Sequence, residues 1–83
     1  MAKLLYFGTI NEILDTDGEH VSLPDNIRDV KALLEYLRNR GDQWDYVFSG
    51  QAGNIQITVN KDFATLKHRI SNIDEIAFVC MGE

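Results

Sequence analysis

The sequence predicts an α+β fold in which one long helix packs on one face of a mixed sheet of four to five strands. Apolar residues recur at steps of three and four over residues 27–40, which is the period of a helix with one buried face. Segments on either side of it show the apolar runs and alternation of strands. A chain of 83 residues has room for one core, and laying the helix across the sheet buries both stripes. Residues 1–83 are therefore expected to form a single domain.

The first two strands are expected to form a hairpin. Residues 3–8 are apolar at nearly every position, which is typical of a strand in the middle of a sheet. Asp15-Thr16-Asp17-Gly18 predicts a turn, and residues 19–23 then alternate until Pro24 ends the strand. Residues 10–14 leave room for a short helical turn between the two strands.

The long helix is expected to run over about residues 27–40. Asn26 is the expected N-cap, Asp29 stands three residues later as in a short capping box, and Gly41 fits a left-handed stop. The buried stripe is expected to comprise Ile27, Val30, Leu34 and Leu37, widened by Leu33.

The second half of the chain predicts a loop and further strands. Residues 42–53 have no clean period and suggest a loop whose short helical turn places an aromatic side chain under the sheet. Residues 55–59 alternate and are β-branched, residues 60–62 supply turn chemistry, and residues 74–79 predict the last strand. The expected core contains Leu4, Tyr6, Val30, Leu34, Ile57, Val59, Ile76 and Phe78.

Composition and charge exclude several classes of protein. The net charge of −5 repels phosphate backbones, so no nucleic-acid partner is expected. The apolar start of the chain ends at Asn11 and Glu12, too early for a signal peptide or a membrane span. A single cysteine, Cys80, excludes an internal disulfide and fits a reducing compartment, so a cytoplasmic protein is expected.

No metal or cofactor site is expected from the sequence. His20 and His68 are far apart and lack a cysteine or carboxylate at ligand spacing. Residues 15–19 resemble the start of a calcium loop, but the glycine and glutamate that complete such a loop are missing. No positive charge adjoins Cys80, which favours a plain thiol at a strand end over a nucleophile.

Several short motifs together resemble the small, sulfur-carrying subunit of molybdopterin synthase and its ThiS-like relatives, a family of ubiquitin-like β-grasp domains. The resemblance covers residues 3–79, and the length of residues 42–53 favours the molybdopterin side of the family over the thiamine side. The motifs that carry it are Lys3-Leu4-Leu5-Tyr6-Phe7, Asp42 with Trp44, Val59-Asn60 with Phe63, His68, and Asp74-Glu75-Ile76-Ala77-Phe78.

The resemblance implies a carrier whose C-terminal Gly-Gly is adenylated by an E1-like activating enzyme, converted to a thiocarboxylate and inserted into the large synthase subunit. Gly82 and Glu83 stand at the carrier position here, so the tail is shorter than the family pattern and has one glycine followed by an acidic residue. Three explanations remain open: an atypical tail, a terminus that is trimmed or supplied separately, or lost carrier chemistry with a retained docking surface.

The resemblance also implies a docking surface on the exposed face of the sheet. Its positions correspond to Phe7, Phe63 and Val79, all of which are apolar here; the alternative is that these side chains belong to the core. Two functions follow as hypotheses. The first is a carrier subunit that binds the large synthase subunit and the activating enzyme, and the second is a ubiquitin-like interaction module without sulfur chemistry. Neither expects a catalytic residue in this chain.

Overall fold

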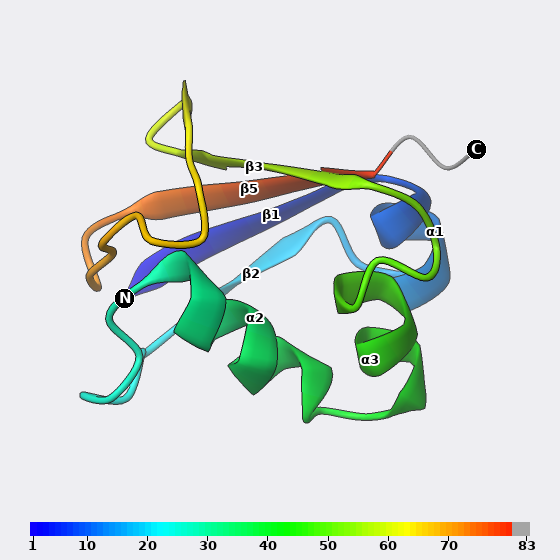
Figure 1. Ribbon diagram of the computed structural model, residues 1–83, viewed down its shortest axis with the longest axis horizontal. Coiled ribbons are helices and arrows are strands. Elements are labelled where there is room, and N and C mark those ends of the chain that lie inside the picture. The colour runs from blue at the N-terminus through cyan, green and yellow to red at the C-terminus, as the bar shows by residue number, and fades with distance from the viewer. Residues whose placement is uncertain (81–83) are drawn as a thin grey trace.

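The computed structural model describes residues 1–80, which form a five-stranded mixed sheet with three helices (Figure 1). No helix in that part of the chain has the length and apolar composition needed to cross a membrane. The strands are β1 (Ala2–Gly8), β2 (Gly18–Val21), β3 (Ile55–Val59), β4 (Asp62–Phe63) and β5 (Glu75–Cys80), and the helices are α1 (Thr9–Leu14), α2 (Val30–Arg38) and α3 (Asp42–Phe48).

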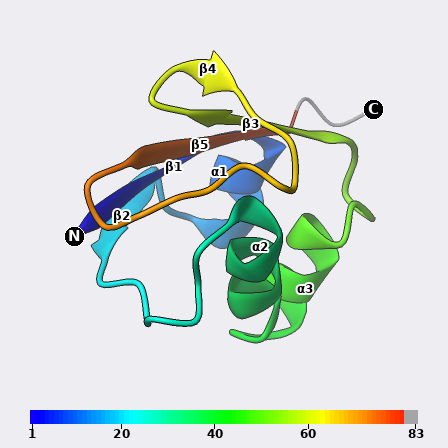
Figure 2. The ribbon, with the colours of Figure 1, turned by 60° about the vertical axis from the view of Figure 1, so that its left-hand side comes forward.

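The strands are arranged in the order β2-β1-β5-β3-β4. β1 and β5 run parallel at the centre of the sheet, and the other neighbouring pairs are antiparallel. The helices lie on one side of this sheet, as the two views in Figures 1 and 2 show. The architecture confirms the predicted β-grasp fold, with one correction: the helical layer consists of three short helices instead of one long helix.

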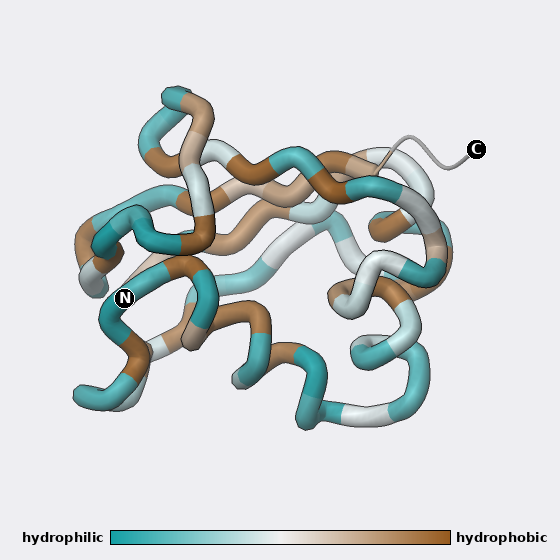
Figure 3. Tube along the Cα trace, in the orientation of Figure 1, coloured by the Kyte–Doolittle hydropathy of each residue, from teal (hydrophilic) through white to brown (hydrophobic). Residues whose placement is uncertain are grey.

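The core fills the space between the sheet and the helices. Hydrophobic stretches run through the strands in Figure 3. Phe48 of α3 reaches under the sheet, where its ring centroid lies 5.2 Å from that of Phe78 and 6.1 Å from that of Tyr6. The prediction that residues 42–53 place an aromatic side chain under the sheet is therefore confirmed.

The predicted start of the long helix is wrong. Residues before Val30 are held by other parts of the chain: Ile27 donates its N–H to the Pro24 carbonyl, and Ile70 donates its N–H to the Arg28 carbonyl. These contacts keep residues 24–29 out of the helix, so the helical period of the sequence extends further than the helix does. The actual N-cap is Asp29, whose carboxylate accepts a hydrogen bond of 2.8 Å from the Ala32 N–H.

The predicted end of the helix is also wrong. Asn39 is the C-cap and has ordinary right-handed angles, with its N–H bonded to the Glu35 carbonyl. Gly41 lies two residues further along and precedes α3. Because α3 follows almost at once, the chain turns from one helix into the next without a left-handed glycine stop.

The buried face of α2 is rotated relative to the prediction. Val30, Leu33 and Leu37 are fully buried, whereas Leu34 is only partly buried. The other predicted core residues are buried as expected. Leu33 therefore takes the central place in the core that the sequence pattern gave to Leu34.

We expect Asp29→Ala to lower the free energy of unfolding by about 1 kcal/mol, because the Ala32 N–H loses its capping acceptor. Urea denaturation measures this loss. Asn26→Ala is the matched control: Asn26 is exposed and lies outside the helix, so this variant should match the parent protein. Equal losses in the two variants would contradict the assignment of the cap.

Candidate functional site

The side of the sheet opposite the helices carries a group of apolar side chains. Phe7 of β1 lies directly opposite Val79 of β5, and Leu5 lies opposite Ala77. Thr58 of β3 lies between Ala77 on one side and Phe63 on the other. Because residues in register on neighbouring strands point to the same face, these side chains share one surface. We name it the outer apolar face: Leu5, Phe7, Phe63, Ala77 and Val79.

Two of these five side chains are unusually exposed for large apolar groups. Phe63 is 80% exposed and Phe7 is 46% exposed, whereas Val79 is shielded by its neighbours in the centre of the sheet. The alternative that all three predicted docking residues belong to the core is therefore wrong. Their binding of a partner stays a prediction.

The sequence pattern missed Leu5 and Ala77. Residues two apart in a strand point to the same face of the sheet. Leu5 is two residues before Phe7 and Ala77 is two residues before Val79, so this rule could have predicted both. The near-continuous apolar character of residues 4–7 hid this alternation. Leu5 and Ala77 lie in register with Thr58 and Phe63, in the row next to the pair of Phe7 and Val79. They therefore connect that pair to Phe63.

A hollow adjoins the outer apolar face beside Phe63. It has a volume of about 460 Å³ and is a depression open to solvent. Ile55, Ile57 and Leu66 line it together with Phe63. The hollow offers an apolar depression next to the most exposed member of the face.

The expected carrier position follows directly after the sheet. Cys80 is the last described residue and ends β5 between Gly8 of β1 and Ile55 of β3. Gly82 and Glu83, the two expected tail residues, lie outside the described residues. The described part of the chain therefore ends on the central strand of the sheet, one residue after Val79 of the outer apolar face.

Cys80 is a buried free thiol, and its Sγ lies 3.8 Å from the Ala52 carbonyl oxygen. This placement agrees with the expectation of a plain thiol at a strand end. His20 and His68 are both exposed. Within residues 1–80, no three His, Cys, Asp or Glu side chains gather as metal ligands would.

A polar network on the helix side connects β2 to the corner between α2 and α3. The hydroxyl of the buried Tyr6 donates a hydrogen bond of 2.7 Å to Glu19, which also forms a 2.6 Å ion pair with Arg40. The Arg40 guanidinium lies 4.6 Å from the centroid of the Trp44 ring and 5.5 Å from that of Tyr36. The network satisfies the one polar atom of Tyr6 and is structural.

Burial raises the pKa of Tyr6, and its hydrogen bond to Glu19 adds to that effect. Burial also acts to raise the pKa of Glu19, but the hydrogen bonds from Arg40 and Tyr6 and the charge of Arg40 outweigh it. The pKa of Glu19 is therefore lowered. A carboxylate with a lowered pKa in the folded state stabilises the fold at neutral pH and loses that effect as the pH falls through its folded pKa.

We expect Glu19→Gln to reduce the dependence of the stability on pH in the acid range. The parent protein should lose stability as the pH falls below about 4.3, the ordinary glutamate value, and the variant should lose less over the same range. Thermal melts between neutral and acid pH measure the difference. Glu12→Gln, at an exposed glutamate, is the control, and an equal reduction there would contradict the role of Glu19.

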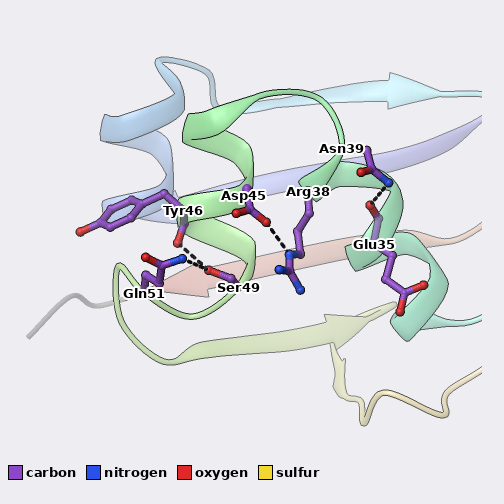
Figure 4. A network of polar contacts seen from close by, with 7 residues as sticks. All are labelled: Glu35, Arg38, Asn39, Asp45, Tyr46, Ser49 and Gln51. Atoms are coloured by element: carbon purple, nitrogen blue, oxygen red, sulfur yellow. Dashed lines mark hydrogen bonds and ion pairs between the residues drawn. The ribbon is translucent and has the colours of Figure 1, made fainter.

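A second group of polar contacts lies around the corner between α2 and α3 (Figure 4). Arg38 forms an ion pair of 2.7 Å with Asp45, and both side chains are about half exposed, at 45% and 48%. The Asn39 side chain donates to the Glu35 carbonyl on the same side of this corner. Exposed pairs of this kind contribute little to stability, and the charges of Arg38 and Asp45 face each other.

Two proteins named as sulfur carrier subunits are similar to this chain over nearly its whole length. A molybdopterin synthase sulfur carrier subunit from Haemophilus influenzae is 28% identical over 78 residues, which cover 94% of this chain and 91% of that protein. The Escherichia coli protein of the same name is 27% identical over the same lengths. Both alignments span nearly the whole of each chain.

Solved structures share the fold. SAMP1 from Haloferax volcanii superposes with a TM-score of 0.77 at 19% identity, covering 95% of this chain and 92% of that one. A candidate molybdopterin converting factor, subunit 1, from Pyrococcus furiosus gives a TM-score of 0.74 at 20% identity, covering 95% and 94%. The profile of the ThiS family matches residues 4–81. Because that match spans nearly the full sequence, the chain belongs to the ThiS family.

Proposed function

We propose that this chain is a sulfur-carrier-type small subunit of molybdopterin synthase or a close paralogue, acting as a single domain over residues 1–83 in the cytoplasm. The observation that carries the proposal is the near full-length similarity to two proteins named as molybdopterin synthase sulfur carrier subunits. The fold supports it, because the described part of the chain ends beside a solvent-exposed apolar face.

In this proposal the outer apolar face binds the large synthase subunit and, at another time, an E1-like adenylating enzyme. Contiguous apolar side chains on the surface of a small protein mark interaction sites. Phe63 and Phe7 supply aromatic area at low conformational cost, and aromatic side chains are enriched at the energetic centres of interfaces. Docking on this face would hold the end of β5, and so the start of the tail, against the partner.

The carrier chemistry takes place at the terminal carboxylate of the tail. The carboxylate attacks the α-phosphate of ATP and releases diphosphate, and sulfide supplied by a donor then displaces AMP from the acyl adenylate to leave a thiocarboxylate. In this proposal the catalytic groups come from the partners. Glycine suits such a tail because it lacks a side chain and adopts extended and left-handed angles freely.

The proposal is tested by sulfur transfer to two versions of the protein. One ends at Glu83 as printed, and the other carries a family-length linker and Gly-Gly after Val79. Each is incubated with a family activating enzyme, ATP and a sulfur donor, and intact mass reports the terminus. We expect efficient thiocarboxylate formation on the rebuilt tail only, because Glu83 brings a second negative charge close to the ATP phosphates.

The outcomes separate the two functions. Sulfur on the rebuilt tail supports a domain that the activating enzyme still recognises. Failure of the rebuilt tail would favour the second function, a ubiquitin-like interaction module without sulfur chemistry. Efficient modification of the version that ends at Glu83 would contradict the expected effect of that residue.

A further inference from the structure

Two segments that are distant in the sequence lie side by side at the start of α2 and bring basic side chains together. Lys31 donates its N–H to the Leu66 carbonyl and Val30 donates its N–H to the His68 carbonyl, each at 3.0 Å. Asp29 and Arg69 form an antiparallel bridge. Figure 1 shows the segment after β4 descending to this end of α2. These contacts bring together four basic side chains, Arg28, Lys31, Lys67 and Arg69. We name this group the basic cluster.

The basic cluster is exposed and its charges are not neutralised by ion pairs. All four side chains are exposed, and the ion pairs found within residues 1–80 involve other cations, Arg38 and Arg40. Arg28 donates to the Asp25 backbone carbonyl, which carries no charge. The carboxylate of Asp29, the nearest acid in the sequence, is used as the cap of α2.

The basic cluster contrasts with the rest of an acidic chain. Its four cations, with Asp25 and Asp29 beside them, give a formal charge of +2, and since the whole chain carries −5, the remainder carries −7. Half of the eight lysines and arginines therefore gather on two short segments. A field of this kind steers a negatively charged partner toward one end of the molecule.

We propose that the basic cluster, together with Leu66, is a second docking surface that binds an acidic segment of a protein partner. Leu66 is 50% exposed and its carbonyl accepts from the Lys31 N–H, so the surface combines an apolar side chain with neighbouring cations. A shallow hollow of about 260 Å³ between Arg28 and Arg69, also lined by Ile27 and Ile70, gives room for a side chain.

Protein fits this surface better than nucleic acid. A nucleic acid carries phosphates along its whole length and would extend past the basic cluster onto the part of the protein that carries −7. A short acidic segment of a protein can match the length of the basic cluster, so it need not extend onto the acidic part of the surface. This inference does not rest on the carrier function, since no part of it involves the tail.

The test uses a blocked peptide with three glutamates on each side of one leucine. It is titrated into the folded protein at low salt, and amide chemical shifts report the site. We expect shifts at residues 28–31 and 66–69, and binding that weakens on raising the salt from about 20 to about 200 mM. A peptide with glutamine in place of glutamate should not bind.

Two double variants with the same change in net charge complete the test. Lys67→Gln with Arg69→Gln should weaken binding about tenfold, because two attractive charges are lost at the site. Lys3→Gln with Lys61→Gln, at exposed lysines elsewhere, should change it less than about twofold. Equal weakening in both, shifts confined to other residues, or tighter binding of a single-stranded DNA of equal charge would each overturn the proposal.

Discussion

Leu33→Ala should lower the free energy of unfolding by about 2 to 5 kcal/mol, because removing a fully buried leucine loses its transfer energy and leaves a cavity. Leu33 lies on the face of α2 that points toward the sheet, between Val30 and Leu37, which are also fully buried. A small domain has a net stability of only a few kcal/mol above this cost. The variant should therefore keep a smaller margin of stability and melt at a lower temperature than the parent protein.

Leu34→Ala is the matched control, since it removes the same atoms from the next residue of the same helix. Leu34 is only partly buried, so its loss should cost about 1 kcal/mol or less. Denaturant titration of both variants gives the two values. A larger loss at Leu34 than at Leu33 would mean that α2 faces the sheet as its apolar period alone suggests.

Four of the five strands were predictable from the sequence because each was marked by a local signal, whereas the two-residue β4 and the order of the strands in the sheet were not. Residues 55–59 alternate, and the observed β3 has the same bounds. The helix was harder, because its apolar period continues to Ile27 while backbone contacts with Pro24 and Ile70 hold residues 27 and 28 outside it. The contact with Pro24 is a local turn, but the contact with Ile70 comes from far along the chain and leaves no mark in the local pattern.

The candidate site was predictable only in part. The family resemblance pointed to Phe7, Phe63 and Val79, and the register of the strands puts them on one face. Leu5 and Ala77 needed that register, because an apolar residue in a central strand can belong to either face. The basic cluster could not be predicted, since 35 or more positions separate its two segments and only the folded chain joins them.

Phe63→Asp should weaken binding to a large synthase subunit by about 30-fold or more, because aromatic side chains at the centre of an interface contribute about 2 kcal/mol or more each. Phe63 is 80% exposed in the free chain, so aspartate there causes little loss of core packing. In the complex, however, the same carboxylate would be removed from water against an apolar surface. The affinity should therefore fall far more than the stability does.

The matched control is Ile73→Asp. Ile73 is an apolar residue that is 92% exposed, and it lies before β5 in the chain. Phe63, by contrast, is on β4, opposite Thr58 of β3. Val79→Asp, next to the end of β5, should also weaken binding, with some loss of stability because Val79 is shielded in the centre of the sheet. Titration calorimetry with thermal melts measures both quantities. If the affinity falls equally in the Phe63 and Ile73 variants, added negative charge alone weakens the complex. If the affinity is unchanged in the Phe63 and Val79 variants, the docking site does not lie on the outer apolar face.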